Sequence, residues 1–182
     1  GWAMQGRKGI LVLATGTNNI DMAAAKAQGV PVRNVSNYGT HSVAQHTLML
    51  ILALAARLPR YQHDVRGGAW QQSPFFCLLN HNTTELAGKT LVIVGQGTLG
   101  TAVAKLAEAF GMTVMFCARP GAEGDSRLPF EQAIEQADVL SFHCPLNEHT
   151  RHLLNRDNID RLKRGCLVVN CARGGIIDEM AA

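Results

Sequence analysis

Residues 92–100, VIVGQGTLG, have the glycine spacing of a dinucleotide-binding turn. Three glycines make the pattern: Gly95, Gly97 and Gly100. Between a strand and a helix, the first glycine allows a tight turn, the second lets the backbone approach a pyrophosphate, and the third lets the helix pack closely on the strand. The apolar segment before this pattern and the amphipathic segment after it are typical of that strand and that helix.

The start of this helix is the expected phosphate site. The backbone amides of Thr98 and Leu99 lie at its positive end, where anions bind. The alternative is an ordinary strand-to-helix turn of the same shape without a ligand.

The end of the next apolar run bears on which nucleotide would bind. An NAD site usually holds the ribose 2′-hydroxyl with an acidic residue at this position, about 20 residues after the glycine turn. Here the position is Ala118, followed by Arg119. Because an Arg can pair with a 2′-phosphate, the sequence favours NADP over NAD. The alternative is that Arg119 is an ordinary solvated residue.

The elements around the turn alternate regularly from residue 89 onward. We expect strands at 89–95, 112–118, 138–144 and 166–171, and helices at 98–111, 129–137, 155–165 and from 178 onward. Strands that are apolar throughout and alternate with helices indicate a parallel sheet covered on both faces. The fold class is therefore α/β, a doubly wound parallel sheet of the Rossmann type.

The first part of the chain has a different organisation. It predicts a strand at 9–14, a helix at 21–28, a second strand at 30–35, and a long apolar helix at 43–58 closed by Pro59. Residues 60–84 show no regular pattern and are interpreted as an irregular excursion that could contact a partner. We also expect the chain to be a fragment, because a doubly wound sheet normally continues.

Composition narrows the function classes. The 182 residues are 47% hydrophobic and 17% charged with a net charge of +3, which indicates a globular protein and argues against nucleic acid. The apolar segment 43–58 is short for a membrane span. Five cysteines without CxxC spacing indicate reduced thiols in a cytoplasmic protein and no metal site.

Three further motifs carry a family resemblance. They are LATGTNNID (13–21), HCPLNEHT (143–150) and VVNCARGGIIDE (168–179). With the glycine turn, they make the chain resemble the D-isomer-specific 2-hydroxyacid dehydrogenases, in the hydroxypyruvate/glycerate and glyoxylate reductase branch. The resemblance implies a partial, flavodoxin-like substrate domain at 1–37, an NAD(P)-binding domain at 38–182 that is incomplete at its C-terminus, and a homodimer.

The resemblance also implies site residues. Arg173 matches the catalytic Arg, which grips a 2-oxo acid and polarises its carbonyl. The other matched positions are Thr15 and Gly16 for the substrate carboxylate, and His143, Pro145, Cys171 and Ala172 along the cofactor. Without the resemblance, His143 could equally be a hydrogen-bonded core residue, and Arg173 could bind only solvent.

The implied function is hydride transfer between a nicotinamide dinucleotide and a small 2-oxo or 2-hydroxy acid. The family's acid/base His and its partner Glu are expected beyond the last of these motifs, so this chain by itself would be a poor enzyme. One alternative is a nucleotide-sensing binding protein similar to the C-terminal-binding-protein corepressors. Another is an inactive fragment.

Overall fold

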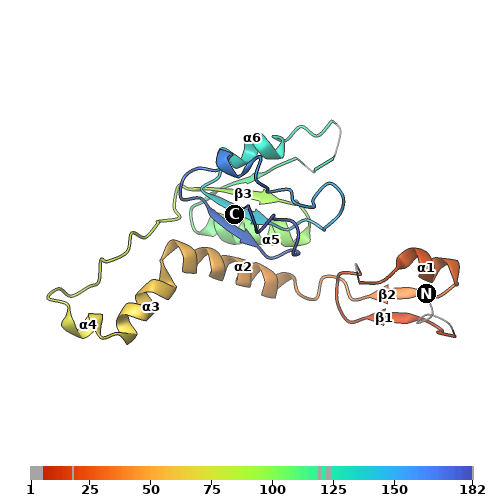
Figure 1. Ribbon diagram of the computed structural model, residues 1–182, viewed down its shortest axis with the longest axis horizontal. Coiled ribbons are helices and arrows are strands. Elements are labelled where there is room, and N and C mark those ends of the chain that lie inside the picture. The colour runs from red at the N-terminus through yellow and green to blue at the C-terminus, as the bar shows by residue number, and fades with distance from the viewer. Residues whose placement is uncertain (1–5, 18, 119, 122–123, 182) are drawn as a thin grey trace. The chain divides into compact units, whose positions relative to one another are not determined.

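The chain divides into two compact units, Gly1–Thr40 and His41–Ala182. The computed structural model describes residues 6–17, 19–118, 120–121 and 124–181 (Figure 1). The predicted assignment of 1–37 to a substrate domain and 38–182 to a nucleotide domain stays a prediction.

Unit 1 is a small strand–helix–strand motif. Strands β1 (Ile10–Val12) and β2 (Val32–Asn34) pair in parallel, with Ile10 opposite Val32. Helix α1 (Met22–Ala27) joins them, and the Asp21 carboxylate caps its start by accepting a hydrogen bond from the Ala24 amide at 2.8 Å. The predicted elements are confirmed, although each is shorter than the sequence pattern.

Unit 2 is built on a parallel sheet of four strands in the order β4-β3-β5-β6. The strands are β3 (Thr90–Val94), β4 (Thr113–Phe116), β5 (Val139–Phe142) and β6 (Leu167–Asn170). After β3 the chain adds β4 on one side and then crosses to add β5 on the other. The predicted doubly wound α/β fold is confirmed.

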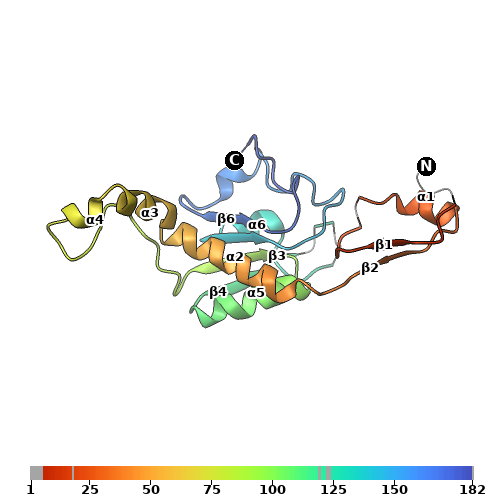
Figure 2. The same cartoon turned by 90° about the horizontal axis from the view of Figure 1, so that it is seen from below.

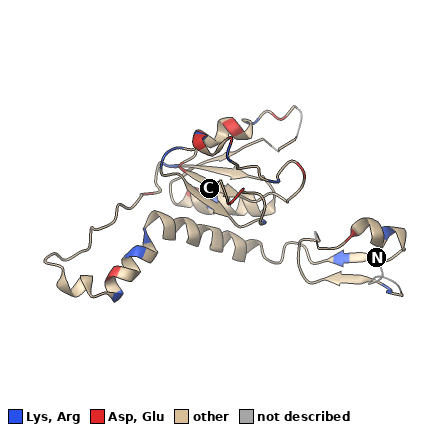
Figure 3. Cartoon of the chain, in the orientation of Figure 1, with Lys and Arg blue, Asp and Glu red and all other residues tan. Residues whose placement is uncertain are grey.

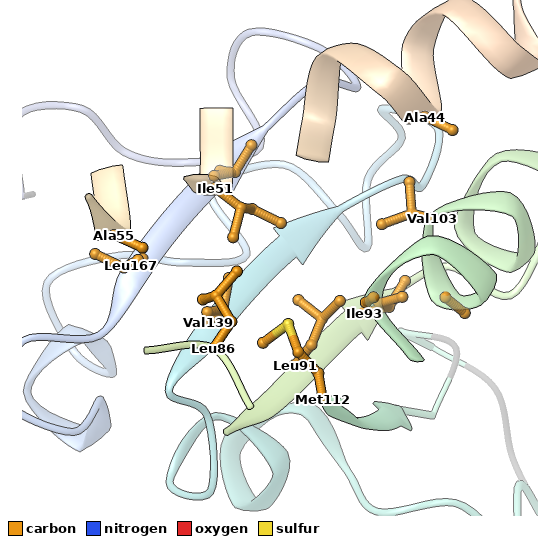
Figure 4. Close-up of a cluster of buried hydrophobic side chains, with 13 residues drawn as sticks. Ala44, Ile51, Ala55, Leu86, Leu91, Ile93, Val103, Met112, Val139 and Leu167 are labelled. Atoms are coloured by element: carbon orange, nitrogen blue, oxygen red, sulfur yellow. The ribbon is translucent and has the colours of Figure 1, made fainter. Parts of the chain in front are cut away.

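Alternate residues of the central strands bury their side chains in two separate cores. Leu91 and Ile93 of β3 belong to the core that contains residues of α5 (Thr98–Ala109) and α2 (Thr40–Ala55), shown in Figure 4. Val92 and Val94 belong to the opposite core, which contains residues of α6 (Phe130–Ile134). Figure 1 shows α6 above this sheet and α5 below it, and in Figure 2 α2 crosses in front of the sheet.

Helix α2 is the apolar helix expected from the sequence. It contains no Lys, Arg, Asp or Glu, as Figure 3 shows. Its buried residues recur at helical spacing: Ala44, Thr47, Ile51 and Ala55. Among the described residues no single helix is long and apolar enough to cross a membrane, although α2 and α3, bent by 62° at their break, pass together on length and composition.

The interpretation of residues 60–84 as irregular is wrong for their first half. The chain breaks at Arg57, whose φ is +53°, and continues as α3 (Leu58–Arg66) and α4 (Ala69–Gln72). Pro59 therefore lies in the first turn of a new helix, where its missing N–H costs nothing, rather than simply closing the old one.

The two C-terminal helices predicted from the sequence are also wrong. Residues 155–165 contain only a 3₁₀ turn, Ile159–Arg161, because Asn155 and Asn158 use their side chains in local hydrogen bonds to the backbone. From residue 178 the described chain makes a turn, in which the Asp178 carboxylate accepts a hydrogen bond from the Met180 amide at 3.2 Å.

Candidate functional site

The predicted site residues of unit 2 lie at one edge of the sheet. Because all four strands are parallel, their carboxyl ends share that edge. The glycine turn follows β3, His143 follows β5, and Arg173 comes three residues after β6. The strand order reverses between β3 and β5, which is where open α/β sheets bind ligands.

Two glycines of the turn are required by the packing of the protein itself. Gly95 has a φ of +109°, and a Cβ there would lie 2.7 Å from the His143 carbonyl oxygen. A Cβ on Gly100 would overlap the Gly95 carbonyl oxygen. The turn after β3 and the start of the loop after β5 therefore lie in direct backbone contact.

Gly97 has no such internal requirement. Its φ of −84° and ψ of −171° suit any residue, and a Cβ would meet no described atom within 4 Å. Gly97 is also the N-cap of α5 and offers no side chain to the first helical amides. The backbone here is an open cradle at the positive end of a helix, and a pyrophosphate fits it.

His143 is a buried neutral imidazole beside this turn. Its Nε2 lies 2.8 Å from the Ser141 hydroxyl, and its Nδ1 has no hydrogen-bond partner among the described residues. Burial lowers the pKa of His143 to about 4. The side chain is thus part of the core, and the polar Nδ1 atom still has unused bonding capacity.

The loop after β5 is braced by side chains that the sequence analysis missed. The Thr150 hydroxyl donates to the Pro145 carbonyl at 2.6 Å, and the Asn147 side chain accepts from the amides of His149 and Thr150. These bonds fix the course of the chain at Pro145. An Asn three residues before a Thr is the signal that could have indicated them.

Arg173 lies in a turn that Asn170 holds from both sides. The Asn170 side-chain oxygen accepts from the Ala172 amide at 3.0 Å, and its Nδ2 donates to the Arg173 carbonyl at 2.8 Å. The exposed Arg173 guanidinium donates to the Ala172 carbonyl at 2.8 Å. Asn170 was not predicted as a site residue, and it holds Arg173 at the edge of the sheet. Cys171 and Ala172 are half-buried.

The remaining predicted residues lie elsewhere. Thr15 and Gly16 follow β1 in unit 1, where the Asn34 side chain donates to the Thr15 carbonyl at 2.7 Å. Ala118 follows β4, and its amide donates to the Leu128 carbonyl at 2.8 Å. Arg119 lies outside the described residues.

A doubly wound parallel sheet with an open glycine turn at its switch point defines a dinucleotide-binding domain of the Rossmann type. Residues 48–182 match the sequence model of one family of such domains, the D-isomer specific 2-hydroxyacid dehydrogenase, NAD binding domain. The chain belongs to this family, as its motifs predicted. The family supports a nicotinamide dinucleotide as cofactor.

Individual relatives agree with this family. The chain is 40% identical to a glycerate dehydrogenase of Methylorubrum extorquens over 94% of this chain and 54% of the relative. It is 35% identical to a hydroxypyruvate reductase of Blautia hydrogenotrophica over 92% of this chain and 54% of the relative. The chain therefore spans about half the length of these curated relatives.

The solved structures show the same likeness. A D-lactate dehydrogenase of Aquifex aeolicus, complexed with NAD and lactic acid, superimposes with a TM-score of 0.85. The two chains are 31% identical, and the match covers 98% of this chain and 54% of the other.

Proposed function

We propose that the protein is an oxidoreductase that transfers a hydride between a nicotinamide dinucleotide and a small 2-oxo acid of the hydroxypyruvate or glyoxylate type. The open cradle at Gly97 carries the proposal, because the packing of the protein gives no reason for a glycine there and a bound pyrophosphate does. Relatives named glycerate dehydrogenase and hydroxypyruvate reductase support the substrate class.

Different residues at the carboxyl edge of the sheet bind the dinucleotide and the substrate. The dinucleotide, when bound, supplies or accepts the hydride. The amides of Thr98 and Leu99 hold its pyrophosphate, and His143, Pro145, Cys171 and Ala172 line the rest of its path.

The substrate is anchored by a cation. Arg173 grips the carboxylate and carbonyl oxygens of the 2-oxo acid, and its positive charge stabilises the oxyanion that forms as the hydride arrives. Thr15 and Gly16 bind the carboxylate through their backbone amides. His143 is unsuited to deliver the proton, because its pKa of about 4 leaves it neutral near pH 7.

The preferred cofactor in this proposal is NADP(H). Ala118, which follows β4, lacks the carboxylate that would accept a hydrogen bond from a ribose 2′-hydroxyl and repel a 2′-phosphate. Arg119 next to it supplies a positive charge.

A homodimer is proposed as the assembly. The segment that contains α4 and the following loop exposes large apolar side chains, which single chains rarely leave uncovered in one place. Their exposed fractions are 54% for Trp70, 73% for Phe75, 93% for Phe76 and 82% for Leu79.

Two glycine variants test the nucleotide site. Gly97→Ala adds a methyl group to the cradle, so NADPH and NADH affinity should fall by roughly tenfold or more, while the free energy of unfolding changes by less than about 1 kcal/mol. Gly100→Ala forces a clash inside the protein and should cost about 3 kcal/mol of stability. Calorimetric titration and urea unfolding measure the two effects.

The nucleotide affinity of Gly97→Ala decides the outcome. If Gly97→Ala binds both nucleotides as tightly as the unchanged chain, the cradle does not hold the pyrophosphate and the proposal fails. The proposal also fails if the unchanged chain binds neither nucleotide.

Arg173→Lys tests the substrate anchor. Lys keeps the charge but loses the planar fork, so glyoxylate or hydroxypyruvate should bind the nucleotide-loaded chain roughly tenfold more weakly. Arg156→Lys is the matched control, because Arg156 is also exposed but does not lie in the Asn170–Gly175 turn. Equal 2-oxo acid affinity in both variants would remove Arg173 from the substrate site.

A further inference from the structure

A cavity of about 360 Å³ lies between the loop after β4 and the loop after β5. Its lining includes Ala118, Asp125 and Arg127 from the first loop, and His149 and Leu153 from the second. The two loops touch, because a Cβ on Gly121 would lie 2.6 Å from the His149 ring. This volume is within the range of about 300–1,000 Å³ that small-molecule sites occupy.

Arg127 connects this cavity to the glycine turn. One of its Nη atoms donates to the side-chain oxygen of Gln96 at 2.8 Å, and Gln96 lies between Gly95 and Gly97. The Arg127 side chain is 29% exposed, so solvent and ligands reach it. A guanidinium group thus lies at the border between the cradle and the cavity that Ala118 lines.

Asp125 fixes the orientation of this guanidinium. Its two carboxylate oxygens accept from Nε at 2.9 Å and from the second Nη at 2.5 Å, which is the bidentate geometry of a strong ion pair. The hydrogen bond to Asp125 also raises the pKa of Arg127, so the group stays charged. Held in this way, Arg127 loses little side-chain freedom when it binds a ligand.

The ion pair still leaves Arg127 able to bind an anion. An arginine has five N–H donors, and the bonds to Asp125 and Gln96 use three of them. One donor remains on each Nη atom beyond these bonds. The Asp125 carboxylate, by contrast, also accepts from the Arg127 amide at 3.0 Å, which makes it a poor acceptor for a ribose hydroxyl.

We infer that Arg127 is a specificity-determining residue that binds the 2′-phosphate of NADP(H) from the loop after β4, oriented by Asp125 and Gln96. The inference rests on the proposed dinucleotide site. It places the phosphate where the carboxylate expected at Ala118 is missing, within reach of a fixed guanidinium. A 2′-hydroxyl carries no charge and gains little from the same residue.

Adenosine fragments isolate this contact from the rest of the site. Adenosine 2′,5′-bisphosphate and adenosine 5′-monophosphate differ only in the 2′-phosphate, and NADPH and NADH repeat the comparison in full cofactors. Calorimetry on the full chain measures all four affinities. Arg127→Gln should weaken both 2′-phosphorylated ligands by about 10- to 100-fold and leave the other two within about twofold.

Two further variants sharpen the result. Arg127→Lys keeps the charge without the fork and should lose an intermediate amount of NADPH affinity. Arg164→Gln removes the same charge from an exposed turn before β6, at the opposite edge of the sheet, and should change none of the four affinities. Thermal unfolding of each variant establishes that it is folded.

The failures are distinguishable. If Arg127→Gln weakens all four ligands equally, Arg127 only supports the glycine turn through Gln96, and the inference is overturned. It is also overturned if no affinity changes, or if the unchanged chain binds NADH but neither 2′-phosphorylated ligand; in these cases the dinucleotide site itself stands. If the unchanged chain binds none of the four, the proposed function fails and the inference falls with it.

Discussion

His143 makes the stability of the folded chain depend on pH. Its pKa of about 4 lies below the ordinary value of about 6.5, because burial disfavours the charged imidazolium. Between these two values the unfolded chain binds the proton more readily than the folded chain does. The contribution of His143 to the free energy of unfolding is therefore fully present above about pH 6.5 and is lost as the pH falls toward 4.

The expected loss is about 3 kcal/mol across this interval. Urea unfolding near pH 7 and near pH 5 should show much of it in the unchanged chain and much less in His143→Gln, which cannot titrate. His149→Gln is the control, because the His149 side chain is 53% exposed. A stability difference between the two pH values that is equally large in His143→Gln would mean that another group causes it.

At the scale of elements, α3, α4 and the loop after them form an arm with its own anchoring. The Asp64 carboxylate of α3 lies 2.9 Å from Nε2 of His81, and the Tyr61 hydroxyl donates to the His81 carbonyl at 2.9 Å. Through these contacts, the chain at His81 lies against α3. Between α4 and this residue, Phe75, Phe76 and Leu79 stay exposed.

This arm should mediate the proposed homodimer. Phe76→Ser replaces a side chain that is 93% exposed, so it should weaken association without unfolding the chain. Sedimentation equilibrium should show dimers for the unchanged chain and a shift toward monomers for the variant. Phe110→Ser, at a 44% exposed position after α5, should leave the dimer intact. A monomeric unchanged chain would contradict the proposal.

The strands were predictable because burial on both faces leaves a strong pattern. All four strands of unit 2 coincide with mostly apolar segments, and β3 and β5 are buried almost throughout. The helices were less predictable, since short polar segments depend on local bonds. In residues 155–165, Asn155 and Asn158 bind nearby backbone groups, which outweighs a helical spacing of Ile159 and Leu162.

Across the whole molecule, the sequence identified residues whose types carry chemistry, and it missed residues that hold them in place. The glycine turn, His143 and Arg173 could be found from motifs. Asn170 acts through two hydrogen bonds inside its own turn. Gln96 bonds Arg127, 31 residues further along the chain, so its partner is set by the fold and no local pattern reports it. The motif predicted the role of Gly97, whereas the lack of any packing contact that requires a glycine there follows only from the space around it.

The sheet order also determines which residues at this edge stay together. β3 and β5 are paired on both sides, whereas β4 and β6 end the described sheet. The backbone contact between the glycine turn and His143 therefore depends on the pairing of β3 with β5. The glycine turn and His143 follow the inner strands, while Ala118 and Arg173 follow the outer ones. If β4 or β6 loosens, the proposed pyrophosphate site therefore stays joined to His143, whereas the proposed sites for the ribose phosphate and for the 2-oxo acid move with the outer strands.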